Sequence, residues 1–150
     1  MNTKRLNTKF YTDQFLAKTK YLEGNTGAWI YTTGKFTVAY PCTNLSEVGD
    51  TLQQFADDVG IPDQLSSDLA SEITGNHTEF QDKVKCLRID LTHSEVERSN
   101  QNHVAEGKIG HQKKCFCQNM VSKKVPKRLC DYGLVHQDSI LSRIACGKTG

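Results

Sequence analysis

The chain has 150 residues, of which 37% are hydrophobic and 24% charged, and its formal net charge is +2. This length suits one domain with a single core. No apolar run approaches the roughly 20 residues of a membrane-spanning helix, and residues 1–7 lack the apolar segment of a signal peptide. We therefore expect an intracellular protein with no membrane partner.

Alternating apolar and polar residues predict strands in the first part of the chain. Residues 10–15 alternate in this way, and residues 28–32 and 36–40 flank the turn 33–35 as a hairpin. A three-stranded antiparallel start is therefore expected. A helix is predicted next over residues 45–59, with its apolar positions at Leu45, Val48, Leu52, Phe55, Ala56 and Val59.

This first helix has recognisable ends. Asn44 and Glu47 are placed as a capping pair at its start, and Gly60, followed closely by Pro62, is placed to stop it. Both signals favour a helix that is complete before the next strand begins.

The middle of the chain predicts a parallel extension of the sheet. Residues 64–68 form a short strand, a second helix is marked by Phe80, Val84 and Leu87, and residues 88–92 form a further strand. Because strands and helices alternate here, parallel crossovers are expected.

Two helices are predicted in the last third. The first begins near Asn100 and ends before Pro126, which cannot continue a helix. We divide the chain into a core at 1–125 and a truncated helical extension at 126–150. The apolar positions are Ala105, Ile109, Phe116 and Met120 in the first helix and Leu129, Leu134, Leu141 and Ile144 in the second.

The small net charge conceals a strong asymmetry along the chain. Residues 51–100 carry 4 basic and 10 acidic side chains, whereas residues 101–150 carry 9 basic and 3 acidic ones. Such a basic segment can follow a phosphate backbone, although a solvated helix face is the alternative. The basic cluster comprises Lys108, Lys113, Lys114, Lys123, Lys124, Lys127 and Arg128.

Three acids stand at positions that suggest a metal site. Asp13 lies on the first predicted strand, Asp68 at the end of the fourth and Glu106 on the long helix. Gathered carboxylates repel one another unless they hold cations, and carboxylate oxygen is the ligand that Mg²⁺ prefers. Taken singly, each acid has an ordinary structural alternative: an exposed strand residue, a helix cap or a solvent-facing helix residue.

The six cysteines do not favour a zinc site. No Cys-x-x-Cys pair occurs, and the spacing of Cys115 and Cys117 is awkward for tetrahedral chelation from a helix. A site built from His111, Cys115 and Cys117 remains a minor alternative to ordinary thiols.

The sequence resembles the integrase core of copia-type retrotransposons, within the retroviral integrase superfamily. The resemblance rests on residues 101–106 (QNHVAE), residues 10–13 (FYTD) and residues 59–62 (VGIP) ahead of Asp68. It covers nearly the whole chain. Its downstream continuation is at residues 124–129 (KVPKRL) and 131–135 (DYGLV).

The resemblance implies an α/β, ribonuclease-H-like fold, in which helices flank a five-stranded mixed sheet. It assigns Asp13, Asp68 and Glu106 as the catalytic and metal-binding acids, with two Mg²⁺ or Mn²⁺ ions as cofactors. The implied reaction is phosphodiester cleavage followed by DNA strand transfer, which inserts element DNA into a target.

The same resemblance implies partners and a location. The partners are DNA, as element ends and as target, and further copies of the chain in a homo-oligomer. The expected location is the nucleus. From the helix face shared with Glu106, the DNA contacts are expected at Lys113, Lys108, Asn102 and His103.

Two other functions stay open. Gly107 and Gly110 weaken the helix that carries Glu106, so the chain is alternatively an inactive remnant that retains only nucleic-acid binding or an interaction role. A ribonuclease H has the same fold, although the QNHVAE context favours an integrase.

Overall fold

The computed structural model describes residues 4–16, 20–33, 35–67, 79–93 and 99–146. Five strands form one sheet in the order β3-β2-β1-β4-β5. The first three strands pair antiparallel, whereas β4 runs parallel to β1 and β5 parallel to β4, which confirms the predicted mixed sheet. The strands are β1 Arg5–Leu16, β2 Gly27–Thr32, β3 Thr37–Cys42, β4 Ile61–Ser67 and β5 Asp90–His93.

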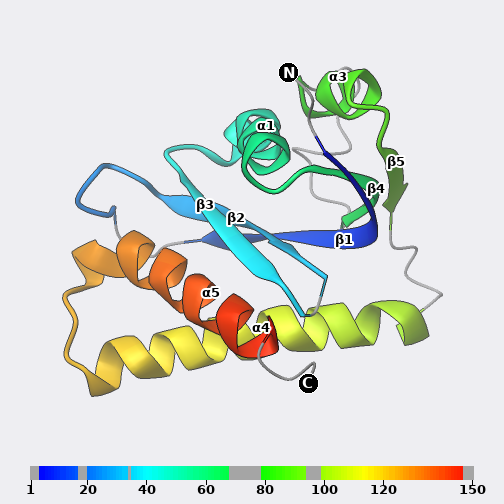
Figure 1. The fold of residues 1–150 in the computed structure, drawn as a ribbon. Coiled ribbons are helices and arrows are strands. Elements are labelled where there is room, and N and C mark those ends of the chain that lie inside the picture. The colour runs from blue at the N-terminus through cyan, green and yellow to red at the C-terminus, as the bar shows by residue number, and fades with distance from the viewer. Residues whose placement is uncertain (1–3, 17–19, 34, 68–78, 94–98, 147–150) are drawn as a thin grey trace.

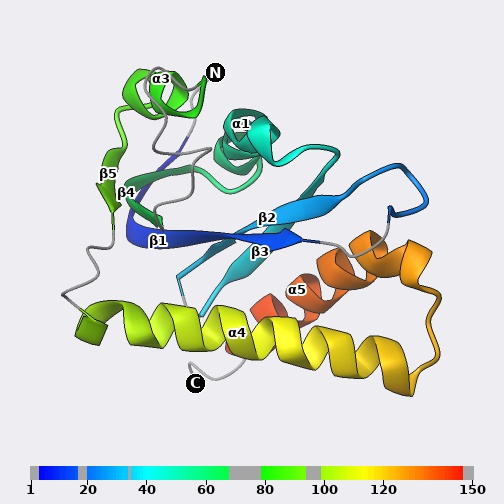
Figure 2. The same ribbon diagram turned by 180° about the vertical axis from the view of Figure 1, so that it is seen from behind.

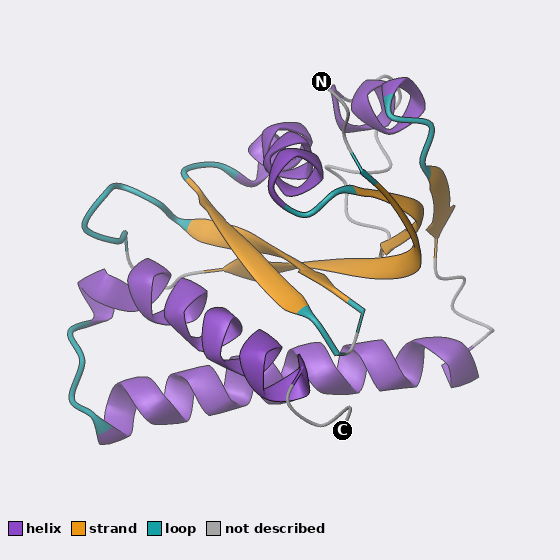
Figure 3. Cartoon of the chain, in the orientation of Figure 1, coloured by secondary structure: helices purple, strands orange, loops and turns teal. Residues whose placement is uncertain are grey.

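Helices cover both faces of this sheet. Figure 1 shows α1 and α3 on one face and α4 and α5 on the other, and Figure 2 shows α4 running along the sheet beneath β1. The three-layer arrangement is also clear when the chain is coloured by secondary structure (Figure 3). The helices are α1 Val48–Asp58, α3 Glu79–Cys86, α4 Ser99–Ser122 and α5 Cys130–Cys146, with short 3-10 turns at Leu45–Glu47 and Lys127–Leu129.

The described core consists of two hydrophobic clusters, one on each face of the sheet. Strand β2 supplies residues to both clusters because it is buried on both faces. Trp29 and Tyr31 belong to the cluster beneath α1, where the Tyr31 ring stacks on Phe55 at a centroid distance of 4.8 Å. Ala28 and Ile30 point the other way and belong to the cluster beneath α4 and α5. This alternation follows from the two-residue period of a strand. All six residues of β2 are buried as a result.

The predicted ends of the first helix are only partly right. Asn44 caps it as expected, since its side chain accepts a hydrogen bond from the Ser46 N–H at 3.2 Å. Glu47 instead accepts from the Thr43 N–H at 3.3 Å. The first turn, Leu45–Glu47, is a 3-10 turn, and the α-helix begins at Val48.

Strand β4 is longer than predicted. It begins at Ile61, which pairs with Arg5, and it contains Pro62, which was expected only to stop the preceding helix. Proline is tolerated there because β5 pairs with β4 only from Gln64 onward, so within the described part of the chain Pro62 has β1 as its one neighbouring strand.

Helix α5 packs against the same sheet as the other helices. Leu134 is fully buried in the cluster beneath α4 and α5. The Ser142 hydroxyl accepts a hydrogen bond from the Thr37 N–H of β3 and donates one to the Thr37 carbonyl. The division at 125/126 stays a prediction. Within the described residues no helix is both long enough and apolar enough to cross a membrane.

Gly60 occupies a position that alanine cannot fill without strain. Its φ is +134°, and an added Cβ would lie 2.6 Å from the Lys4 carbonyl oxygen, which accepts a hydrogen bond from Ile61. Gly60→Ala is expected to lower the free energy of unfolding by about 2–3 kcal/mol. Gly24 is the control, because its φ is also positive, at +85°, but its Cβ would meet open space.

Gly24→Ala is expected to lower the unfolding free energy by about 1 kcal/mol. Urea denaturation of both variants measures the difference. Equal losses in the two variants would show that the contact with Lys4 contributes nothing.

Candidate functional site

Asp13 lies on β1, on the sheet face that α4 covers. It shares this face with Phe15, whose ring meets Phe116 of α4 edge to face at 5.7 Å. The Asp13 side chain is 30% exposed, and its Oδ1 accepts a hydrogen bond from the Gln14 N–H at 2.8 Å. The other oxygen, Oδ2, is therefore available to a second partner.

Lys113 of α4 is that partner. Its Nζ lies 2.7 Å from Asp13 Oδ2 and also 2.7 Å from the Gln14 carbonyl oxygen. The contact joins residues that are 100 positions apart and ties α4 to β1. Sequence reasoning assigned Lys113 to DNA, from its helix face, and missed its pairing with Asp13.

Asp68 lies outside the described residues. Strand β4, which precedes it, ends at Ser67, and Ser67 pairs with Thr12, the residue just before Asp13. The chain therefore leaves β4 beside Asp13, one residue before Asp68.

The remaining predicted positions are on α4, but their side chains fall outside the described part of the structure. They are Glu106, Asn102, His103 and Lys108. Glu106 is two helical turns, or about 10 Å, from Lys113 on the same helix face. Within the described residues, the predicted site residues brought together are Asp13 and Lys113.

The described part of the chain contains no group of three potential metal ligands. Asp13 nevertheless has the chemistry of a magnesium ligand, because its carboxylate is an oxygen donor and is partly open to solvent. The ammonium of Lys113 now balances its charge. A cation that bound Oδ2 would have to replace that ammonium.

The basic cluster divides into two parts in the structure. Lys113 faces the sheet, whereas Lys114 is exposed on another side of α4. The turn between α4 and α5 begins about 15 Å further along the helix. It carries four more exposed cations, which are Lys123, Lys124, Lys127 and Arg128.

The zinc alternative gains no support in the described residues. His111 and Cys115 do meet, with Nε2 and Sγ 3.3 Å apart on the surface of α4. No third ligand joins them among the residues that the structure describes. Two ligands on an open helix face do not make a tetrahedral site.

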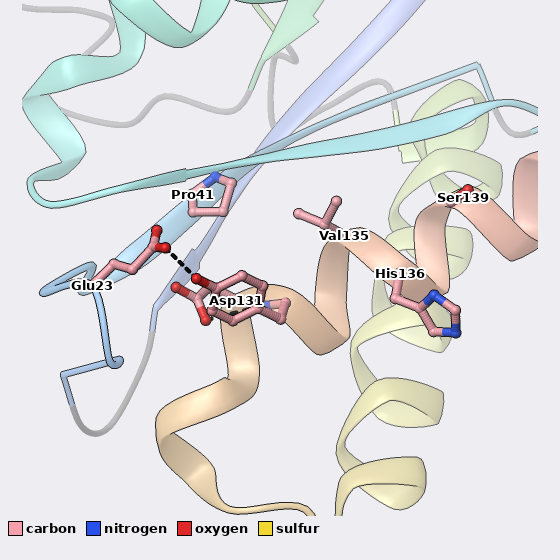
Figure 4. Close-up of a pocket in the computed structure, with 7 residues that line it drawn as sticks. Glu23, Pro41, Asp131, Val135, His136 and Ser139 are labelled. Atoms are coloured by element: carbon pink, nitrogen blue, oxygen red, sulfur yellow. Dashed lines mark hydrogen bonds between the residues drawn. The ribbon is translucent and has the colours of Figure 1, made fainter.

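A separate cavity of about 450 Å³ lies where α5 meets the sheet, and no sequence motif predicted it. Figure 4 shows Glu23 reaching toward the start of α5. Its carboxylate accepts a hydrogen bond from the Tyr132 hydroxyl, while Asp131 accepts one from Asn25 at 3.1 Å. Both acids that line the cavity are therefore already engaged in hydrogen bonds. Its lining residues are Glu23, Pro41, Asp131, Tyr132, Val135, His136 and Ser139.

The chain is similar in structure to retroviral integrase catalytic cores. It matches the catalytic core domain of BIV integrase with a TM-score of 0.63 and 13% identity, over 96% of this chain and 86% of that one. It also matches the simian T-cell lymphotropic virus intasome in complex with the PP2A regulatory subunit B56 gamma, with a TM-score of 0.64 and 16% identity. That match covers 85% of this chain and about half, 47%, of the other.

No protein-family model and no curated protein matches the sequence. At identities this low, the likeness to solved structures establishes the fold. The chain has the ribonuclease-H-like fold of integrase catalytic cores, as the sequence predicted.

Proposed function

We propose that the chain is the catalytic core of a retrotransposon integrase of the copia type, which cleaves DNA and joins it to a target. Asp13, Asp68 and Glu106 are its metal-binding acids. The observation that carries the proposal is the meeting of three elements: β1 with Asp13, the end of β4 next to Asp68, and α4, which carries Glu106 and is tied to Asp13 through Lys113.

The chemistry would follow from carboxylates that hold two Mg²⁺ or Mn²⁺ ions. Two such ions, roughly 3.5–4 Å apart, suit in-line displacement at phosphorus. Asp13 presents its carboxylate from a rigid strand next to the sheet core, and Lys113 supplies a positive charge for a DNA phosphate. The proposed partners are element ends, target DNA and further copies of the chain, and the proposed location is the nucleus.

The test is a strand-joining assay with the full chain, short DNA duplexes and Mn²⁺ or Mg²⁺. The expected result is nicking near a 3′ end and joining of that end to a second duplex, with both products lost when a chelator removes the metal. Cleavage that continues in the presence of chelator would contradict the proposal.

An inactive remnant is the second candidate, and the neutralisation of Asp13 by Lys113 is the observation that favours it. A remnant would bind DNA through its exposed basic turn, with an affinity that falls steeply as salt rises. It would yield no product with either metal, which separates it from an active integrase.

A further inference from the structure

We propose that Lys113 is an exchangeable counterion, which neutralises Asp13 when no metal is bound and moves to a DNA phosphate when a divalent cation takes its place. Binding of the cation and of DNA would then be positively coupled through one side chain. The inference rests on the proposed function, because it assigns Asp13 to a metal.

The geometry gives Lys113 a defined resting position. Its ammonium donates to the Asp13 carboxylate and the Gln14 carbonyl, both at 2.7 Å. Among the described residues, Asp13 is the acid that forms an ion pair with it. Two short contacts to neighbouring residues of β1 hold the ammonium where a cation bound to Oδ2 would lie.

The helix around Lys113 is fixed, so the exchange needs only a side-chain movement. Ile109, Gln112 and Phe116 are 4%, 5% and 2% exposed, which anchors α4 on both sides of Lys113. Lys113 itself is 29% exposed at the side chain and has a flexible four-carbon stem. The ammonium can therefore leave Asp13 for solvent or phosphate without displacing α4.

Electrostatics give the exchange its direction. A divalent cation and an ammonium cannot share Oδ2 without strong repulsion, so a bound cation expels Lys113. The expelled ammonium then favours a phosphate oxygen, which offers a charge-assisted hydrogen bond. By linkage, a cation that strengthens DNA binding must itself be bound more tightly in the presence of DNA.

The first experiment measures Mn²⁺ binding to the DNA-free chain by calorimetry. Lys113→Met keeps the length of the stem but removes the competitor, so the Kd for Mn²⁺ is expected to fall about three- to tenfold. Lys114→Met is the matched control, because it removes the same charge from the exposed adjacent position of the same helix. Its effect is expected to stay within twofold.

The second experiment measures DNA affinity by fluorescence anisotropy with Ca²⁺ or with chelator, and a gel checks that the DNA is intact. The quantity compared is the ratio of the DNA Kd in chelator to the DNA Kd in Ca²⁺. This ratio is expected to be at least three times larger for the wild type than for Lys113→Met. Asp13→Asn frees the lysine permanently, so this variant should bind DNA more tightly than wild type in chelator and should lose the response to Ca²⁺.

The outcomes separate the two proposals. If Mn²⁺ binding depends on Asp13 but Lys113→Met behaves as Lys114→Met does, the counterion exchange is wrong and the metal site stands. If neither the wild type nor Lys113→Met shows any Mn²⁺ binding that is lost on replacing Asp13 by asparagine, the proposed metal site is wrong. The counterion exchange is then wrong as well.

Discussion

Replacement of Asp13 by asparagine is expected to lower the rate of metal-dependent DNA joining about a thousandfold, which corresponds to a loss of ~4 kcal/mol of transition-state stabilisation. The amide has the shape of the carboxylate but lacks the charge that holds a divalent cation. Its oxygen can still accept the hydrogen bond from the Gln14 N–H, so the local backbone should be unchanged. The initial rate of product formation at saturating Mn²⁺ measures the effect.

Asp63→Asn is the matched control for this variant. Asp63 is also a strand aspartate. It pairs with Arg5 at 3.7 Å, near the start of β4, whereas Ser67 is at the other end of that strand. Its replacement is expected to leave the joining rate within twofold of wild type. Both variants should retain the wild-type free energy of unfolding to within about 1 kcal/mol, because each loses a partly exposed ion pair. Equal joining rates in Asp13→Asn and wild type would remove Asp13 from the site.

The sheet could be predicted from the sequence because periodicity reports burial directly. The hairpin formed by β2 and β3 follows from alternating residues on either side of a short turn, and the structure pairs Thr32 with Thr37 across it. The start of β4 could not be predicted in the same way. The pairing of Ile61 with Arg5 is a tertiary contact, which local sequence does not report. Pro62 indicates the end of an element unless it is known that β5 does not pair with β4 at this position.

The candidate site was less accessible to sequence reasoning. The surroundings of Asp13 singled it out, but the partner of its carboxylate is 100 residues away, and helical periodicity gives only the face of α4 on which Lys113 lies. Counting formal charges was also insufficient. Such a count treats Asp138 as one more negative charge, whereas the structure buries this side chain to 2% exposure between α4 and α5.

Asp138 is expected to make the protein less stable as pH rises. Gln112 of α4 donates a hydrogen bond to Asp138 Oδ1, but Oδ2 is buried with no partner among the described residues. Burial is the main cause that raises the pKa of Asp138 from 3.8 to about 7, while the Gln112 hydrogen bond acts in the opposite direction. Between pH 4 and pH 7 the folded state therefore binds a proton that the unfolded state has released.

The sign of the effect follows from linkage: where the folded state holds the extra proton, the free energy of unfolding falls as pH rises. The total fall across this window is at most about 4 kcal/mol. Asp138→Asn keeps an acceptor for Gln112 and cannot ionise, so the part of the pH slope that Asp138 causes should vanish. At pH 8 the variant is expected to be about 2–4 kcal/mol more stable than wild type, and at pH 4 nearly equal to it.

Urea denaturation from pH 4 to pH 8 measures this difference, and comparison with wild type cancels the titration of the other groups. Asp131→Asn is the control, since Asp131 is also buried on α5 but accepts hydrogen bonds from Asn25 and from the Tyr132 N–H, at 3.1 Å and 2.9 Å. That variant leaves Asp138 untouched and should retain its contribution to the slope. If the free energy of unfolding of Asp138→Asn depends on pH as steeply as that of the wild type, the interpretation is wrong. That result would mean that water reaches the Asp138 carboxyl in the wild type and that α5 packs on α4 without a neutral acid between them.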